Sequence, residues 1–506
     1  MNIKNNQENL IIIGSGTAGK LLTKEIRNNP ILNYNLLGFL DDFKKKGSKI
    51  IGLPIFGKIS DLQNIIEKYN VKKVIIAIPS LKKERFEKII SLCGKVGIKT
   101  LILPPSYESL YSLKTGRPWI REPRPININD LLRRDIVKAD FKGLKETISN
   151  KNILVTGGGG SIGRELCMQL AELSPKNLLI LDNCEYNLYK IDLDLRDKYG
   201  SKLKTTPIIG DIKDKRFIDE IFDRENIDIV FHVAAYKHVP IMESNIRELV
   251  KNNIFGTYNV ACAAEKNMVK KFILVSTDKV VNPTSVMGVS KKIAEIVLSL
   301  FGNNTEYITV RFGNVLGSVG SIIPLFEEQI KKGGPVTITH PKIKRYFMTI
   351  PEAAQLILQA SSIGKDKNVL ILDMGKQYLI KDIAEKLIQL HGFEPHKDIK
   401  LRYIGLRPGD KLLEELWTEK EKVSKTSHKR IFMIKLEKSD KKKIRCCLKD
   451  LSLLVQKGDI KGIKIKFKEL VPSYQMISLS KASSYQDNKD NSPKERIEIW
   501  KQKGRK

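Results

Sequence analysis

Three side chains able to transfer protons stand next to one another in the sequence: Thr277, Asp278 and Lys279. They follow the apolar run 271–275, which predicts a buried strand. In open α/β sheets, ligands bind beyond the carboxyl ends of the strands. We therefore expect this hydroxyl, carboxylate and amine to lie at a ligand pocket, where they can exchange protons with a substrate.

Met287 and Lys291 lie shortly downstream, four residues apart. Residues 291–297 have the apolar spacing of a helix, which would place both side chains on one face. Pro283 and Gly288 are expected to break the chain between strand and helix, leaving a loop that can fold over the pocket. The Met side chain has no proton to transfer. Either the protein is inactive or the spacing is a chance pattern, or the hydroxyl, carboxylate and amine upstream supply the proton chemistry.

A glycine-rich stretch predicts a dinucleotide-binding loop. It lies between the predicted strand 152–156 and an amphipathic helix that starts at Arg164. Glycines in such a turn let the backbone approach a pyrophosphate at the helix N-terminus. The glycines with this spacing are Gly157, Gly160 and Gly163. The next predicted strand, 177–181, ends at Asp182, whose carboxylate can accept hydrogen bonds from an adenosine ribose and favours NAD over NADP.

A similar glycine spacing occurs near the N-terminus, at residues 14–19, directly after the apolar run 10–13. Asp41 or Asp42, after the next predicted strand, could bind a ribose hydroxyl. Two interpretations are open: this unit binds a nucleotide or sugar nucleotide, or it is a scaffold that keeps its glycines for tight turns. Further strands are predicted at 73–78 and 100–103.

These elements predict an α/β fold with two Rossmann-like, doubly wound parallel-sheet domains. The first is expected at residues 1–112 and the second at 151–435, ending in a small C-terminal substrate-binding subdomain. Proline and arginine density predicts an extended linker at 113–150. Residues 436–506 read as a basic extension with a short helical stretch, and the polar segment 481–506 is expected to be disordered.

The 506 residues carry 89 Lys and Arg against 57 Asp and Glu, a net charge of +32. Such a charge first suggests a nucleic-acid binder. The lysines, however, are spread along the whole chain among many Asn and Ile residues, a pattern that codon bias in an AT-rich genome explains, so no nucleic-acid partner is expected. Attraction to anionic substrates or to an anionic membrane surface remains physically plausible, and peripheral membrane association stays open.

Cysteine and histidine usage indicates a reduced protein without a bound metal. The six Cys residues include no C-x-x-C pair, and the six His residues show no metal-ligand spacing. No apolar run is long enough to span a bilayer, and the N-terminus does not resemble a signal peptide. A cytoplasmic location is therefore expected.

The run Ser-Thr-Asp-Lys at 276–279, followed by Pro283, Met287-Gly288 and Lys291, resembles the nucleotide-sugar 4,6-dehydratases of bacterial polysaccharide and glycoprotein biosynthesis. These CapD-like proteins are extended short-chain dehydrogenases, and in one branch Met replaces the Tyr of the Tyr-x-x-x-Lys pair. The resemblance covers roughly residues 8 to 435. It implies a tightly bound NAD or NADP that is recycled, a UDP-sugar substrate and a homo-oligomer.

The resemblance also implies roles for individual residues. The catalytic group comprises Thr277, Asp278, Lys279, Met287 and Lys291. The cofactor-binding group comprises Gly157, Gly160, Ser161, Ile162, Gly163, Asp182, Asp211, Ile212, Ala234, Ala235 and Lys291. The substrate-binding group comprises Lys237, Asn314, Arg345 and Arg407, of which the two arginines suit a diphosphate. His238 is read as structural, Asn253 as a support for the active-site backbone, and Asp410 replaces the family's Glu with a shorter carboxylate.

The implied activity is dehydration of UDP-N-acetylglucosamine to a 4-keto-6-deoxy sugar. Lys279 is the expected base at C5 and Asp278 the acid at the C6 hydroxyl, whereas Thr277 or a water serves the C4 hydroxyl. A lysine needs a lowered pKa to act as a base at neutral pH. Two alternatives remain open: a nucleotide-sugar 4-epimerase, and a sensor of nucleotide sugars without catalytic activity.

Overall fold

The computed structural model describes residues 7–29, 33–103, 123–126, 130, 141–435 and 440–475. It confirms an α/β fold. The chain divides into two compact units. The first contains the described parts of Met1–Ile136 with Phe326–Thr337 and Lys381–Arg402, and the second contains the rest.

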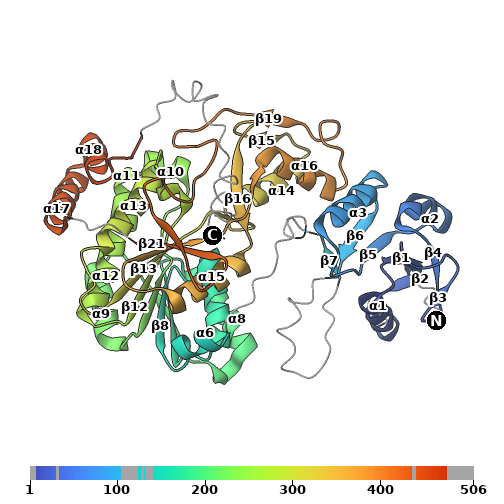
Figure 1. Ribbon diagram of the computed structural model, residues 1–506, viewed down its shortest axis with the longest axis horizontal. Helices are drawn as coiled ribbons and strands as arrows, with labels where there is room; N and C mark the ends of the chain where they lie inside the picture. Colours follow the sequence, from blue (N-terminus) through green and yellow to red (C-terminus); the bar gives the residue numbers. More distant parts are fainter. Residues whose placement is uncertain are drawn as a thin grey trace, which may run out of the picture. The chain divides into compact units, whose positions relative to one another are not determined.

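In the first unit, seven described strands form one sheet in the order β3-β4-β2-β1-β5-β6-β7. The central strands are short apolar runs buried on both faces, as parallel strands covered by helices must be. The strands are β1 (Glu8–Ile13), β2 (Tyr34–Leu40), β3 (Lys49–Ile50), β4 (Leu53–Gly57), β5 (Lys73–Ile76), β6 (Lys99–Ile102) and β7 (Arg124–Pro125). The helices that connect the strands of this sheet are α1 (Thr17–Asn28), α2 (Leu62–Tyr69) and α3 (Lys83–Lys95) (Figure 1).

The glycine loop of this unit is explained in large part by its own packing. Gly14 has φ +101°, and a Cβ on Gly19 would lie 2.1 Å from the carbonyl oxygen of Gly14. The Oδ2 atom of Asp41 accepts hydrogen bonds from the backbone N and the hydroxyl of Ser15, at 2.9 and 2.6 Å. These contacts support the scaffold interpretation, because two glycines and the acidic residue all serve the turn itself.

The second unit is built on a nine-stranded sheet in the order β10-β9-β8-β11-β12-β13-β17-β21-β20. The strands from β10 to β17 in this order run parallel to one another. β21 pairs with β17 in the antiparallel direction, and β20 pairs with β21 in the antiparallel direction. The bounds are β8 (Asn152–Thr156), β9 (Asn177–Asp182), β10 (Thr205–Ile209), β11 (Ile229–His232), β12 (Lys271–Val275), β13 (Glu306–Arg311), β17 (Asn368–Leu372), β20 (Val423–Lys425) and β21 (Ile431–Lys435). The strand order reverses direction between β8 and β11, which is where ligands bind in such sheets.

Helices cover both faces of this sheet and form two separate apolar cores. One core includes residues of α6 (Phe141–Ile148), α7 (Ser161–Glu172), α8 (Glu185–Tyr199) and α15 (Ile350–Ile363). The other includes α9 (Lys215–Glu225), α12 (Thr257–Lys266), α13 (Val286–Leu298), α17 (Lys441–Lys457) and α18 (Ile460–Leu470). The C-terminal region beyond residue 440 is thus a pair of helices packed on the core, more than the single helical stretch expected.

The helix that carries Lys291 begins earlier than the sequence suggested. α13 starts at Val286, where the hydroxyl of Ser285 accepts a hydrogen bond from the backbone N of Gly288 as an N-cap. Gly288 therefore lies inside the helix, and the expectation that it breaks the chain was wrong. A Cβ at this position would lie 2.4 Å from the carbonyl oxygen of Lys279, so the glycine lets the helix pack closely on the preceding turn.

Smaller elements complete the two units. β14 (Asn314–Val315), β16 (Lys344–Met348) and β18 (Gln377–Leu379) form a three-stranded sheet beyond the large one. β15 (Val336–Ile338) pairs with β19 (Leu401–Tyr403), and most residues of these two strands and of α14 (Ile322–Lys331) and α16 (Ile380–Leu390) belong to the first unit. Among the described helices, none combines the length and apolar character needed to cross a bilayer.

Two expectations fall wholly or partly outside the described residues. The polar tail 481–506 and most of the segment 113–150 belong to this group. The described parts of that segment include α6, whose Leu144 and Ile148 are buried in the core of the second unit.

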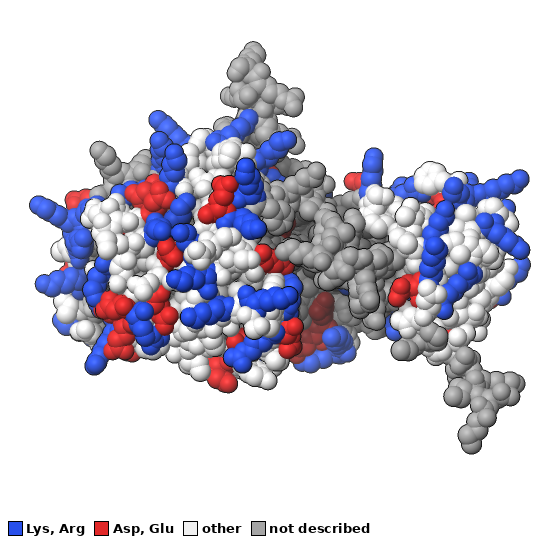
Figure 2. Space-filling model, turned by 90° about the horizontal axis from the view of Figure 1, so that it is seen from below, with Lys and Arg blue, Asp and Glu red and all other residues white. Residues whose placement is uncertain are grey.

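Figure 2 shows basic side chains spread over the visible face and interleaved with acidic ones.

Candidate active site

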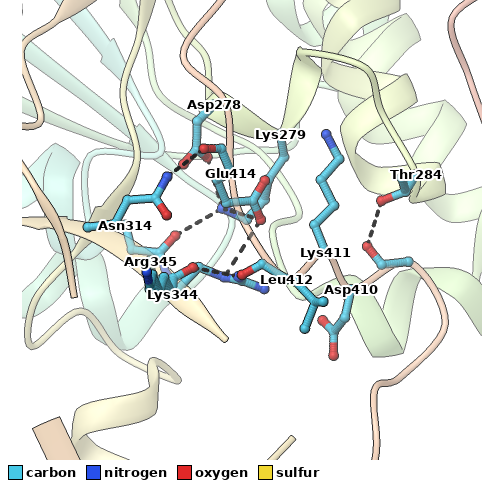
Figure 3. A network of polar contacts seen from close by, with 12 residues as sticks. Asp278, Lys279, Thr284, Asn314, Lys344, Arg345, Asp410, Lys411, Leu412 and Glu414 are labelled. Carbon is cyan, nitrogen blue, oxygen red and sulfur yellow. Dashed lines mark hydrogen bonds and ion pairs between the residues drawn. The ribbon is translucent and has the colours of Figure 1, made fainter. Parts of the chain in front are cut away.

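Lys279 is the centre of a polar cluster beyond the end of β12 (Figure 3). Its Nζ donates hydrogen bonds to Oδ1 of Asp278 and to Oδ1 of Asn314, both at 2.9 Å. A third oxygen, Oε1 of Glu414, lies 4.0 Å from the same nitrogen. The Lys279 side chain is 22% exposed, so a ligand can reach it. The structure thus brings Asp278, Lys279 and Asn314 together.

Local backbone contacts place these groups. The backbone N of Asp278 donates to the carbonyl oxygen of Phe312, which continues the β12–β13 pairing past the strand ends. The hydroxyl of Thr277 donates to Oδ1 of Asp278 at 3.0 Å. A Cβ on Gly313 would lie 2.9 Å from Oδ2 of Asp278, so only glycine leaves that carboxylate its space. The positions of these side chains therefore depend on the backbone contacts just beyond the ends of two adjacent parallel strands, β12 and β13.

The environment of Asp278 favours its protonated form. Burial raises the pKa of this fully buried carboxyl, and the nearby carboxylate of Glu414 raises it further, against the lowering effect of Lys279. Its Oδ2 atom has no hydrogen-bond partner. A buried carboxyl oxygen without a partner is costly unless it carries a proton or meets a ligand, and both conditions suit an acid.

Lys279 does not have the lowered pKa expected of a base. Burial alone would lower its pKa, but the carboxylates of Asp278 and Glu414 outweigh that effect, and the pKa is raised. The lysine is consequently an ammonium in the resting site. Sequence reasoning considered burial and cationic neighbours, and it missed the second carboxylate.

Glu414 is the functional candidate that sequence reasoning did not single out. Its side chain is buried, its Oε1 lies 3.6 Å from Nε of Arg345, and its Oε2 has no hydrogen-bond partner. Burial would raise its pKa, but the cations of Lys279, Arg345 and Lys411 outweigh burial and lower it. The only signal in the sequence was its position seven residues after Arg407, within the same family-like segment.

Arg345 lies against this cluster. Its side chain is buried, and Nη1 donates to the carbonyl oxygens of Lys344 and Leu412 at 2.8 and 3.3 Å. Together with its contact to Glu414, this places its charge beside the proton-transfer groups. Arg407 is different: its side chain is 50% exposed, and its Nε donates to Oδ2 of Asp410 at 3.0 Å. The shorter carboxylate of Asp410 thus orients Arg407.

The segment that carries Arg407 and Glu414 is fastened over the turn between β12 and α13. The hydroxyl of Thr284 donates to the carbonyl oxygen of Gly409 at 3.0 Å, and Nζ of Lys411 donates to the carbonyl oxygen of Val281 at 2.7 Å. The turn at 281–285 is therefore covered by a distant part of the chain, and it does not itself form a free flap.

Lys291 is a buried cation with no partner. Its side chain makes no hydrogen bond or ion pair with any other described residue, although the residue is only 4% exposed. Burial lowers its pKa to about 8, against the opposing effect of Glu295. Met287, four residues before it, is also buried. An unpaired buried ammonium on the site side of α13 is suited to bind ligand hydroxyls.

The second glycine loop fits a dinucleotide. Gly157 has φ +67°, and a Cβ on Gly163 would lie 2.1 Å from the carbonyl oxygen of Gly157, so both are required by the turn and by packing. Gly160 has ordinary backbone angles, and its only close neighbour would be that same oxygen at 3.3 Å. Packing constrains Gly160 less than Gly163, and the missing Cβ also leaves the N-terminus of α7 open to close approach of a ligand.

Acidic residues stand at the ends of the next two strands. Asp182 accepts hydrogen bonds from the backbone N atoms of Gly159 and Cys184, both at 2.9 Å, which fixes its carboxylate beside the glycine loop. Asp211 accepts from the backbone N of Lys213 and forms an ion pair with its Nζ at 3.3 Å. Ile212 is buried in the core beneath this turn. These residues have the positions that adenosine contacts require.

Ser161 and Lys237 meet on one exposed loop. The hydroxyl of Ser161 accepts from the backbone N of Val319, whose carbonyl oxygen accepts from Nζ of Lys237 at 3.0 Å. His238 packs on the same loop, because a Cβ on Gly320 would lie 2.4 Å from its ring. Ile162, Ala234 and Ala235 are partly exposed near the glycine loop; a Cβ on Gly157 would lie 2.7 Å from the backbone of Ala234.

Asn253 and His232 support the end of β11. Asn253 lies in the π-helical turn η5 (Val250–Gly256), accepts from the backbone N of Tyr236 and donates to its carbonyl oxygen. Fully buried His232 bridges the hydroxyls of Thr156 and Thr257, at 2.8 and 3.0 Å. Burial lowers the pKa of His232 to about 3, so the neutral ring links β8 to the first residue of α12.

Comparison with known proteins agrees with this architecture. Residues 153–436 match the family described as polysaccharide biosynthesis protein, and residues 2–104 match a family described as CoA-binding domain. The chain is 39% identical over 446 residues to a capsular polysaccharide biosynthesis protein of Staphylococcus aureus, CapD, covering 87% of this chain and 74% of that protein. It therefore belongs to the polysaccharide biosynthesis protein family.

Two further relatives match different shares of this chain. A probable polysaccharide biosynthesis protein of Bacillus subtilis, EpsC, is 38% identical, with 81% of this chain and 68% of that protein covered. The X-ray structure of Pen from Bacillus thuringiensis is 35% identical and superposes with a TM-score of 0.53, covering 58% of this chain and 92% of that one.

Proposed function

We propose that the protein is a 4,6-dehydratase of UDP-N-acetylglucosamine that uses NAD or NADP and supplies a 4-keto-6-deoxy sugar for surface polysaccharide or glycoprotein synthesis. The main observation is the contact of Lys279 Nζ with Oδ1 of fully buried Asp278 at 2.9 Å, beside an Oδ2 atom that has no partner. Similarity to the Staphylococcus aureus and Bacillus subtilis polysaccharide biosynthesis proteins supports the nucleotide-sugar assignment. Residues 151–435 would form the catalytic domain.

A nicotinamide dinucleotide would supply hydride acceptance from C4 of the sugar and hydride return to C6. The protein would hold this group with the loop from Gly157 to Gly163, with Asp182 at the adenosine ribose and with the free ammonium of Lys291 at the nicotinamide ribose. Thr277, whose hydroxyl donates to Asp278, would hydrogen-bond to the C4 hydroxyl, and the C4 proton would leave through a water to solvent, because Asp278 already holds the proton of the pair in the reactive form.

The Asp278–Lys279 pair carries one proton to share across a 2.9 Å contact. In the resting site this proton is on the lysine, which the raised pKa of Lys279 favours. The reactive form has the proton on Asp278, whose raised pKa keeps this form accessible. Neutral Lys279 then takes the C5 proton, and Asp278 gives its proton to the departing C6 oxygen. No net proton uptake is needed to reach the reactive form.

The test is incubation of the purified protein with UDP-N-acetylglucosamine, followed by mass spectrometry for loss of water and NMR for the 4-keto-6-deoxy product. In deuterated water, deuterium should appear at C5. Lys279→Met should bind the substrate and still allow C4 oxidation, but should lose deuterium incorporation. Asp278→Asn should retain binding and lose water elimination. Lys271→Met, at the opposite end of β12, is the matched control and should remain active.

Full dehydratase activity in both variants would remove these residues from the mechanism. A product that differs from the substrate only in configuration at C4 would instead identify an epimerase. Bound cofactor and UDP-sugar without any product from the wild-type protein would favour a sensor.

A further inference from the structure

The ammonium of Lys279 has one direction that no hydrogen bond occupies. An ammonium has three N–H donors, and two of them reach Asp278 and Asn314 at 2.9 Å. The third nearby oxygen, Oε1 of Glu414, is 4.0 Å away, which is too far for a hydrogen bond but close enough for strong charge attraction. The site therefore has a charge partner for Lys279 that leaves one direction of its nitrogen open to a substrate.

Glu414 is held at this distance by contacts of its own. Its backbone carbonyl oxygen accepts a hydrogen bond from Nε2 of Gln377 at 2.7 Å, and Nε of Arg345 lies 3.6 Å from Oε1. The neighbouring cations of Lys279, Arg345 and Lys411 keep it ionised, although its side chain is only 4% exposed. A buried carboxylate with an unpartnered Oε2 atom is costly for stability. A role of the Glu414 charge in the chemistry of the site would explain this cost.

We propose that Glu414 is a positioning residue for removal of the C5 proton, and that its carboxylate stabilises the ammonium which forms on Lys279 in that step. The inference rests on the dehydratase function proposed above. In the elimination, the C5–H bond breaks and its electron pair forms the C5–C6 double bond. The C6–O bond breaks at the same time, the C5 proton goes to Lys279, and the proton of Asp278 joins the oxygen to give water.

Other charges around Lys279 do not replace this carboxylate. Asp278 on η6 (Asp278–Val280) is protonated at the start of the step, and Arg345 on β16 and Lys411 are cations that oppose a new positive charge. The buried hydroxyl of Tyr346 is neutral, since burial raises its pKa to about 12. Glu415 is engaged with Asn282 at 3.0 Å and with Lys411. Glu414 is thus the ionised carboxylate nearest to the base when the proton arrives.

The test replaces Glu414→Gln, which keeps the shape and removes the charge. We expect UDP-N-acetylglucosamine affinity by calorimetry to stay close to wild type, and C4 oxidation, followed by nicotinamide absorbance, to persist. Deuterium incorporation at C5 should fall roughly tenfold or more, as for loss of one preorganised electrostatic contact. Both the rise and the fall of activity with pH should move to lower pH, because the carboxylate of Glu414 raises the pKa of Asp278 and that of Lys279. A C5-deuterated substrate should show a larger isotope effect than with wild type.

Two further variants make the result decisive. Glu415→Gln removes the same charge one residue away and should leave all five readouts unchanged. Glu414→Asp keeps the charge and should recover part of the C5 exchange; it also serves if the Gln variant does not fold. Wild-type C5 exchange in Glu414→Gln would overturn the proposal, as would equal loss of C4 oxidation and C5 exchange without a pH shift. Absence of dehydratase activity in the wild-type protein would instead refute the proposed function itself.

Discussion

Arg311 and Glu295 form a buried two-point ion pair that ties the end of β13 to the middle of α13. Nε of Arg311 lies 2.9 Å from Oε1 of Glu295, and Nη2 lies 2.7 Å from Oε2. Both side chains are at most 1% exposed. Because Lys291 is one helical turn before Glu295, this pair fixes the helix that presents the free ammonium to the site. The pair therefore links stability and site geometry.

Breaking this pair should be costly. Replacing Arg311→Met leaves the carboxylate of Glu295 buried without its main partner, and such changes commonly cost about 3–5 kcal/mol of unfolding free energy. Urea unfolding followed by circular dichroism measures the loss. Arg216→Met, on an exposed ion pair of α9, should change stability by less than about 1 kcal/mol and is the control. Equal effects of the two substitutions would contradict the importance of the buried pair.

The same pair predicts a dependence of stability on pH. Burial would raise the pKa of Glu295, but Arg311 and Lys292 outweigh it and hold the pKa at about 2, below the ordinary 4.5. A depressed carboxyl pKa contributes stability that is complete above about pH 4.5 and is lost as the pH falls through 2. Glu295→Gln should flatten the stability profile in this window. An unchanged acid profile would show that other carboxylates dominate acid unfolding.

Lys291 should lower the stability of the cofactor-free protein and strengthen binding of the nicotinamide dinucleotide. Burial lowers its pKa to about 8, so the penalty of a buried charge is present below pH 8 and disappears as the pH rises toward 10.5. Lys291→Met should raise the unfolding free energy of the cofactor-free protein at neutral pH, on the order of 1–3 kcal/mol. It should also lower the nicotinamide dinucleotide content measured after gentle purification. Lys251→Met, an exposed lysine of η5, should do neither.

The two glycine loops offer a matched pair of substitutions. Gly160 and Gly16 both precede a helix with φ −70°; a Cβ would meet only the carbonyl oxygen of Gly157, at 3.3 Å, in the first case and nothing within 4 Å in the second. Gly160→Val should abolish binding of nicotinamide dinucleotide by blocking approach of the pyrophosphate. Gly16→Val should leave that binding unchanged. Loss of binding in the Gly16 variant alone would transfer the cofactor to the first unit.

Arg407 should contribute to substrate affinity. Its exposed guanidinium is held by Asp410, which leaves further N–H donors for a diphosphate. Arg407→Ala should weaken UDP-sugar binding roughly tenfold, as expected for a lost charge-assisted hydrogen bond of about 1.5 kcal/mol or more. Titration calorimetry measures this, with Arg445→Ala on α17 as control. Wild-type affinity in the Arg407 variant would exclude the contact.

Much of this arrangement could be predicted from the sequence because it is local. The apolar runs, the glycine spacing after β8 and the adjacent Asp278 and Lys279 each lie within a few residues of the chain. Gly288 was misread because a glycine signals a break by composition, whereas here it serves close packing against residue 279. The sequence pattern predicted the helix that carries Lys291 but not the residue at which this helix begins.

Contacts between distant parts of the chain could not be predicted in this way. Glu414 lies far downstream of Lys279 and reaches it only because the segment around Gly409 is fastened on the turn at 281–285. The raised pKa of Lys279 follows from that contact, so its direction could not be foreseen either. The bridge from His232 to Thr156 and Thr257 likewise joins three elements that share no sequence pattern.

The segment fastened over the 281–285 turn also orders events during synthesis. The residues proposed to hold the dinucleotide, from Gly157 to Lys291, are all translated before residue 300, whereas the polar cluster around Lys279 gains its last member only at Glu414. If the proposed roles hold, a chain emerging from the ribosome has all its dinucleotide-binding residues well before it has the complete cluster that removes the C5 proton. The nascent protein would thus contain the proposed dinucleotide-binding residues first and the complete proton-transfer cluster last.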